Sequence, residues 1–122
     1  MSKKRIVVIC PGRGSYTRET SNYLKEYGAP ANKSIQWMDD QRETQGLLSL
    51  TNLDRQNFKA RTHMVGENAS SLIYACSFSD FMSIDRTKYE IVSVLGNSMG
   101  WYTALVLSGA VSWENRFHLI NT

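Results

Sequence analysis

The sequence predicts an α/β fold built on parallel strands, and three observations support it. A continuous β-branched run from Ile6 to Cys10 is typical of a strand buried on both faces. A second run, from Tyr89 to Leu95, has the same character. Helical patterns fill the chain between the runs and after the second one, an order typical of α/β domains. We therefore expect parallel strands covered by helices.

Helical periodicity and glycine stops define the other elements. Gly28 and Gly109 each stand just past an apolar stripe, where helices commonly end, and Gly46 interrupts a polar, helix-leaning stretch. Ser112 is a good N-cap for a last stripe. We expect helices over Tyr16–Tyr27, within 32–64, over Glu67–Met82 and Met99–Ser108, and from Ser112 onward.

Length and composition indicate a single globular unit. The chain has 122 residues, of which 42% are hydrophobic and 20% charged, so it fits one small domain and not a disordered chain. Its net charge is +3, and the positive residues are dispersed apart from Lys3-Lys4-Arg5. This triplet is too short for a nucleic-acid arm and is interpreted as a solvated tail, so we expect no nucleic-acid partner.

The cysteine and hydropathy patterns bear on location and metals. Cys10 and Cys76 lie in apolar segments without metal-ligand spacing, so they are interpreted as buried thiols in a reducing compartment, and no metal is expected. The N-terminal apolar run is too short for a signal peptide, and no run approaches the ~20 residues of a membrane span. We expect a cytoplasmic protein without a membrane partner.

The number of strands predicts that the chain is incomplete as a domain. Two strands that are both buried on both faces normally lie inside a wider sheet. The sequence also stops within a helical stripe, at Leu119–Thr122. We expect residues 1–122 to be the N-terminal portion of one larger domain.

The second strand leads into a motif for nucleophilic chemistry. Gly96-Asn97-Ser98-Met99-Gly100 lies between that strand and a helix, as in a nucleophile elbow. The two glycines permit a tight turn that raises Ser98 above the sheet edge. The helix that follows directs its N–H groups toward the place where an oxyanion would form. Ser98 is therefore the predicted nucleophile.

A serine nucleophile needs a base, and neither histidine is a good candidate. His63 precedes the elbow in a loop-like stretch and is expected to be a surface residue. His118 follows Ser98 by twenty residues but lies beside Phe117 in a later helix. We expect the base to lie beyond Thr122.

The first strand also ends in glycines, at Pro11-Gly12-Arg13-Gly14-Ser15. A dinucleotide fingerprint would need glycine where Thr17 stands, and a phosphate-binding P-loop would need a Gly-Lys pair that is missing. A tight loop at the sheet edge remains. Its backbone N–H groups would supply a second oxyanion donor, and the Arg13 side chain is either solvated or directed at an anionic substrate.

Together the two motifs resemble those of malonyl-CoA:acyl carrier protein transacylases and the acyltransferase domains of fatty-acid and polyketide synthases. The Pro11–Ser15 loop is similar to their Pro-Gly-Gln-Gly-Ser loop. The segment from Gly96 to Trp101 is similar to their Gly-His-Ser-x-Gly-Glu, and Tyr102–Leu105 and Gly109-Ala110 to the helix and turn that follow. The resemblance covers nearly the whole chain.

The resemblance implies an α/β-hydrolase-like core and a ping-pong acyl transfer. Ser98 would be acylated by a coenzyme A thioester, most simply malonyl-CoA, and the phosphopantetheine thiol of acyl carrier protein would then accept the acyl group. The backbone N–H groups of Arg13 and Met99 would form the oxyanion hole. Gly12, Gly14, Gly96 and Gly100 would shape the two turns. The coenzyme A thioester is a substrate, and no bound cofactor is expected.

The chain departs from the family at three positions. Arg13 replaces the family's glutamine, Asn97 its histidine and Trp101 its glutamate. The catalytic histidine, the arginine that grips the malonyl carboxylate and the small ferredoxin-like subdomain have no counterpart before Thr122. Since loss of a general base costs about 10²–10⁴-fold in rate, we expect this chain alone to be nearly inactive.

Three other functions stay open at the level of sequence. A serine hydrolase shares the elbow, but it would pass the acyl group to water. A non-catalytic α/β binding module would use Ser98 only to form a turn. A nucleotide-binding domain is disfavoured by Thr17. The acyl group and the oligomeric state are not determined by these residues.

Overall fold

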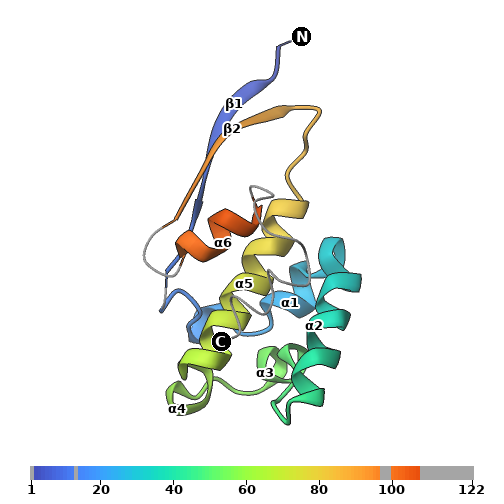
Figure 1. Ribbon diagram of the computed structural model, residues 1–122, viewed down its shortest axis with the longest axis vertical. Helices are drawn as coiled ribbons and strands as arrows, with labels where there is room; N and C mark the ends of the chain where they lie inside the picture. Colours follow the sequence, from blue (N-terminus) through green and yellow to red (C-terminus); the bar gives the residue numbers. More distant parts are fainter. Residues whose placement is uncertain (1, 13, 97–99, 108–122) are drawn as a thin grey trace.

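The computed structural model describes residues 2–12, 14–96 and 100–107, and these form a two-stranded parallel sheet joined to a layer of helices (Figure 1). The expected α/β order and the parallel pairing are confirmed. The strands are β1 (Lys4–Cys10) and β2 (Tyr89–Gly96). Between them lie η1 (Arg18–Thr20), α1 (Tyr23–Tyr27), η2 (Ala29–Ala31), α2 (Asn32–Thr44), α3 (Leu50–Arg55), α4 (Ala60–His63) and α5 (Gly66–Met82), and α6 (Gly100–Leu107) follows β2.

The two strands pair in parallel from end to end. Lys4 lies opposite Tyr89 and Cys10 opposite Gly96, with one irregularity between Ile6 and Val7. Since successive side chains of a strand point to opposite faces, Ile6 and Val8 share one face, where both border hollows that Ile84 also lines. The β-branched run therefore forms the strand that it predicts.

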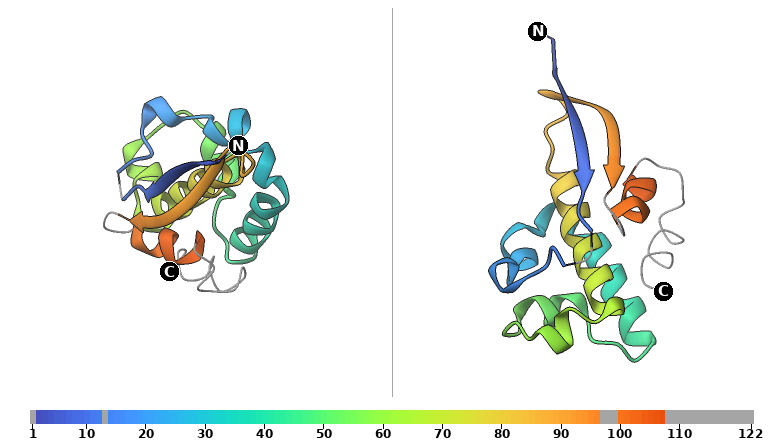
Figure 2. Two further views of the ribbon diagram at one scale, coloured as in Figure 1. Left: turned by 90° about the horizontal axis from the view of Figure 1, so that it is seen from above. Right: turned by 90° about the vertical axis from the view of Figure 1, so that its left-hand side faces the viewer.

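The other face of the sheet is open in the described part of the chain, so the prediction of strands buried on both faces is wrong there. Val7 is 50% exposed, Ile9 is 68% exposed and Leu95 is 41% exposed. Figures 1 and 2 show in addition that the end at which both strands begin extends beyond the helical layer. The described helices therefore leave part of the sheet uncovered.

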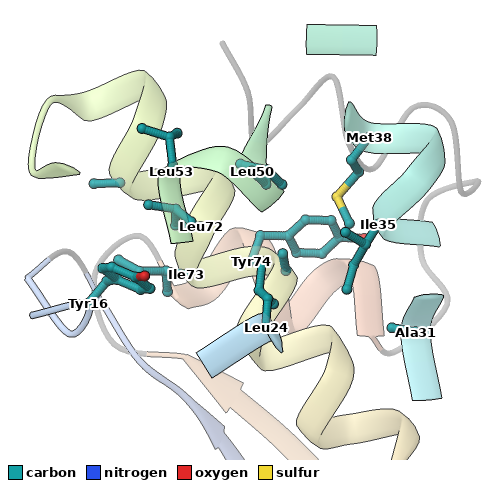
Figure 3. Packing of buried hydrophobic residues seen from close by; sticks show 12 residues of the cluster. Tyr16, Leu24, Ala31, Ile35, Met38, Leu50, Leu53, Leu72, Ile73 and Tyr74 are labelled. Atoms are coloured by element: carbon teal, nitrogen blue, oxygen red, sulfur yellow. The ribbon is translucent and has the colours of Figure 1, made fainter. Parts of the chain in front are cut away.

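The hydrophobic core lies in the helical layer, around α5. This helix passes between its neighbours and contributes apolar side chains to the packing seen in Figure 3. The predicted helix over 67–82 is thus confirmed as the central element. The core cluster consists of Tyr16, Leu24, Ala31, Ile35, Met38, Leu50, Leu53, Ala69, Leu72, Ile73, Tyr74 and Ala75.

A buried arginine ties two helices of this layer together. The side chain of Arg42, on α2, is fully buried, and its Nε donates to the carbonyl of Leu48 at 2.7 Å. Its other nitrogens donate to Ser71 Oγ and Asn68 Oδ1 on α5. Because a buried cation is costly without partners, these bonds explain how a charged residue lies inside the layer.

The helix predicted to begin at Tyr16 begins later. Thr17 and Thr20 bond reciprocally around a short 3-10 turn, through Thr17 N–H to Thr20 Oγ1 and Thr20 Oγ1 to the Thr17 carbonyl. Asn22 then has φ of +67°, which interrupts helical geometry, so α1 starts only at Tyr23. Threonine side chains that bond locally therefore outweigh the apolar stripe. The helix expected from Ser112, and Ser108 and Gly109, lie outside the described residues.

Candidate functional site

Both glycine-containing turns leave the sheet at one edge. Cys10, the last residue of β1, pairs with Gly96, the last residue of β2. Because the strands are parallel, the segments that follow them emerge side by side at the carboxyl edge. The two motifs that lie more than eighty residues apart in the sequence therefore meet in space.

The first turn is held by its own side chains and by a glycine conformation. Ser15 Oγ donates to the carbonyl of Gly12 at 3.0 Å, which closes the loop. Gly14 has φ of +93°, a region that side chains other than glycine's rarely adopt. Gly14 thus has a conformational role in the loop and Gly12 contributes its carbonyl, while Arg13 lies outside the described residues.

The second turn touches the first through Gly100, where α6 begins. A Cβ placed on Gly100 would lie 2.2 Å from the carbonyl oxygen of Cys10 and 2.8 Å from that of Pro11. No real side chain fits that close to backbone oxygens, so only glycine permits this approach. The start of α6 therefore packs directly against the end of β1.

This contact brings the N-terminus of a helix to the first glycine loop. The first N–H groups of a helix have no partner within it and carry partial positive charge, which favours anions. Asn97, Ser98 and Met99, between Gly96 and Gly100, lie outside the described residues. The nucleophilic role of Ser98 and the oxyanion roles of Arg13 and Met99 therefore stay predictions.

The segment after the first turn is anchored by a buried carboxylate. Tyr16 Oη donates to Asp54 Oδ1 at 2.8 Å, and the Lys25 N–H donates to Asp54 Oδ2 at 3.1 Å. Tyr16 and Asp54 are both buried. Burial, with the bond to Asp54, raises the pKa of the Tyr16 hydroxyl, so Tyr16 remains a neutral donor. The exit of the loop is thereby fixed to α3.

His63, expected on the surface, is buried instead. Its Nε2 lies 2.7 Å from the Leu53 carbonyl and its Nδ1 3.1 Å from the Lys59 N–H, so backbone groups engage both ring nitrogens. Its ring also stacks with Tyr16 and Phe58. A histidine held in this way is a structural residue and has no free nitrogen for a substrate proton. The second histidine, His118, lies outside the described residues.

A hollow of about 160 Å³ lies beside the first turn, between it and α5. Its walls include Pro11, Ser15, Tyr23, Cys76 and Asp80, and the Tyr23 hydroxyl donates to Asp80. Burial, with the nearby carboxylates of Asp54 and Asp80, raises the pKa of the Cys76 thiol. The thiol therefore stays protonated and is a poor nucleophile.

Two features of the described residues bear on function. They contain no group of three or more histidine, cysteine, aspartate or glutamate side chains placed to hold a metal ion. None of the described helices has the length and apolar character needed to cross a membrane.

Comparison with known proteins identifies the fold. Neither a protein-family model nor a curated protein sequence matches the chain. Among solved structures, an acyl-carrier-protein S-malonyltransferase from Burkholderia pseudomallei 1710b is similar, with a TM-score of 0.71 and 21% sequence identity. The match covers 97% of this chain and 36% of that chain, so this chain spans little more than a third of that enzyme. The resemblance inferred from the two motifs is confirmed at the level of the fold.

No anchoring role was predicted from the sequence for Tyr16, Asp54 or His63. Tyr16, Asp54 and His63 hold the first turn against α3 and α4, yet they are distant in sequence and belong to no motif. The available signal was weak: an aspartate directly after an apolar residue, and a tyrosine directly after the glycine loop. Only the folded chain brings them together.

Proposed function

We propose that this chain forms the nucleophile half of a cytoplasmic acyltransferase site, which moves a malonyl or related acyl group from coenzyme A to acyl carrier protein. One observation carries the proposal. Gly100 approaches the Cys10 and Pro11 carbonyls at the edge where both strands end, in a fold shared with a malonyltransferase. This contact brings the two glycine turns that flank the expected reaction centre together.

In the proposed reaction Ser98 Oγ attacks the thioester carbonyl carbon and its proton passes to a general base. The negative oxygen of the tetrahedral intermediate accepts hydrogen bonds from the backbone N–H groups of Arg13 and Met99. The carbon–sulfur bond then breaks, and coenzyme A leaves as its thiol after taking the proton. The phosphopantetheine thiol of the carrier protein attacks acyl-Ser98 in the reverse sense and restores the serine.

The general base is proposed to come from polypeptide outside these 122 residues. The described histidine is bound by backbone groups, and the exposed apolar face of the sheet offers surface for a further layer of helices. Residues 1–122 are accordingly proposed to be the N-terminal portion of one acyltransferase domain. The isolated chain is then expected to acylate about 10²–10⁴-fold more slowly than a complete site.

A chimera tests the proposal directly. This chain replaces the matched 36% of the Burkholderia malonyltransferase, and transfer of radiolabelled malonyl from malonyl-CoA to acyl carrier protein is measured. We expect transfer, a malonyl ester on Ser98 detected by mass spectrometry, and loss of both in the Ser98→Ala variant. A folded chimera that never acquires the ester would contradict the proposal.

Two further arms separate the alternatives. Release of malonate at the same rate with and without carrier protein would indicate a hydrolase. Failure of a fluorophosphonate probe to label Ser98 in the folded chimera would indicate a binding module. The 122-residue chain alone is the matched background, and robust labelling of its Ser98 would show that no further polypeptide is needed.

A further inference from the structure

The segment from Arg55 to Arg61 carries three cationic side chains and no acidic residue. Arg55, Lys59 and Arg61 are exposed, and no acidic residue lies between Asp54 and Glu67. Among the residues that the structure describes, these three side chains have no hydrogen bond, ion pair or ring contact. Their charge is therefore available to another molecule. We call residues 55–61 the basic segment.

The basic segment is fixed to the first glycine turn. His63, which follows it, stacks in parallel on Tyr16 at 6.1 Å between ring centroids, and Tyr16 lies two residues after Gly14. On the other side, Ser21 Oγ donates to the Gln56 carbonyl at 3.4 Å. The backbone of this segment is thus held close to the proposed reaction edge at both of its ends.

A second group of cations lies at the far end of the molecule. Lys3, Lys4 and Arg5 stand at the start of β1, and β1 runs from there toward the helices (Figure 1). In the same view α4 lies on the opposite side, beyond the carboxyl edge of the sheet. Of the two groups, only the basic segment lies on the side of the glycine turns. The other serves as a control with the same charge.

We propose that the basic segment Arg55–Arg61 is a docking surface for an acidic protein, which, resting on the proposed function, is the acyl carrier protein that delivers its thiol to Ser98. Unpaired cations near a site accelerate the encounter with an oppositely charged partner and orient it. A carrier protein bound there approaches the molecule from the side of the carboxyl edge of the sheet.

The composition of the segment favours a protein over a nucleic acid. Single-stranded nucleic acids bind to exposed aromatic rings interleaved with cations. The segment's one aromatic residue, Phe58, packs on His63 at 5.2 Å and against the core. The cations therefore lie on a surface suited to contacts between charged side chains.

Paired charge reversals test the surface. The variant R55E/K59E/R61E and the control K3E/K4E/R5E alter net charge equally, and circular dichroism checks that each is folded. Association of the 122-residue chain with immobilised acyl carrier protein is measured at low and at high salt. We expect the first variant to lower the association rate at low salt by about tenfold or more and to weaken its salt dependence. We expect the control to change it less than about twofold.

Three results would contradict the proposed docking surface. These are equal losses of association rate in both variants, no loss in R55E/K59E/R61E, or binding of a single-stranded oligonucleotide as tight as that of the carrier protein. Failure of the proposed function is read separately, from acylation of Ser98 in the chimera. If Ser98 is acylated but R55E/K59E/R61E binds carrier protein normally, the surface is wrong and the function stands. If the variant loses binding but Ser98 is never acylated, the function is wrong and the acidic-protein surface stands.

Discussion

The helical layer and the sheet differ in how far each buries its own apolar residues. In the layer, Leu50, Leu53 and Leu72 are fully buried. In the sheet, Val7, Ile9 and Leu95 are equally apolar yet substantially exposed. Apolar residues in a sequence thus mark surface that gains from burial, and whether the burial occurs depends on the number of layers present. The helices of the layer bury one another's apolar side chains, whereas the sheet leaves several of its apolar side chains exposed.

The two regions also differ in what their polar residues do. In the layer, Asp39 accepts bonds from the Leu50 N–H and the Thr51 hydroxyl, and Arg42 and Asp54 are likewise bonded inside. At the carboxyl edge of the sheet, backbone groups of the two glycine turns approach one another instead. We infer that the free energy of folding resides mainly in the helical layer, while the proposed chemistry belongs to the sheet edge.

The largest expected effect comes from a pair of identical substitutions, Leu72→Ala and Leu95→Ala. Leu72 is 0% exposed and its truncation leaves a cavity in the layer, so we expect a loss of about 3–5 kcal/mol of unfolding free energy. Leu95 is 41% exposed, and its truncation should cost under about 1 kcal/mol. Urea unfolding followed by circular dichroism measures both. Equal losses would mean that the sheet is as well covered as the helical layer.

The next effect concerns the contact between the two turns. Gly100→Ala places a methyl group within 2.2 Å of the Cys10 carbonyl oxygen, so α6 must move away from β1. We expect a loss of about 1–3 kcal/mol, together with loss of Ser98 acylation in the chimera. Gly46→Ala is the control, because its Cβ would meet nothing within 4 Å, although its φ of +76° also disfavours alanine. Acylation that persists at full rate in Gly100→Ala would refute the importance of the contact.

Alkaline pH should weaken the layer through Tyr16. Its folded-state pKa is raised by burial and by Asp54, whereas in the unfolded chain a tyrosine ionises near pH 10. The stabilisation is therefore complete below about pH 10 and decreases as pH rises above it, by at most about 1.4 kcal/mol per pH unit. Tyr16→Phe should be less stable at neutral pH and show a shallower decline between about pH 10 and 11. The raised pKa values of Tyr23 and Cys76 also reduce stability as pH rises. Only the difference in pH dependence between the unsubstituted chain and Tyr16→Phe therefore reports on Tyr16.

Much of the fold was predictable because its determinants are local. The β-branched run at 6–10 and the helically spaced apolar residues at 67–82 each encode a structure within a few residues, and the glycine at 100 permits the close approach of α6 to β1. The parallel order of the strands then followed from the helical connection between them. The resemblance to malonyltransferases rested on the same local motifs.

The errors arose where distant residues decide the outcome. His63 lies in a polar stretch, and its burial depends on Tyr16, on Phe58 and on the Leu53 carbonyl, which no local pattern brings together. The helix expected from Tyr16 was displaced by reciprocal bonds between two threonines, which compete with a helix at little energetic difference. The exposure of Ile9 depends on which layers cover the sheet, and its own sequence carries no information on that.

The smallest expected effect comes from a substitution at Ile9, an exposed apolar residue of the sheet. Ile9→Thr keeps the β-branched shape that strands favour but replaces an ethyl group by a hydroxyl at a site that is 68% exposed. In this chain we expect a change within about 0.5 kcal/mol in unfolding free energy, since the hydroxyl can remain hydrated. In the chimera, where the additional strands and helices of a complete domain are present, the same substitution should cost about 1–3 kcal/mol, because a hydroxyl would then be buried. Thermal unfolding is measured for the 122-residue chain and for the chimera, each with and without Ile9→Thr. An equally small effect in the chimera would show that this face of the sheet is not a surface on which the rest of the domain packs.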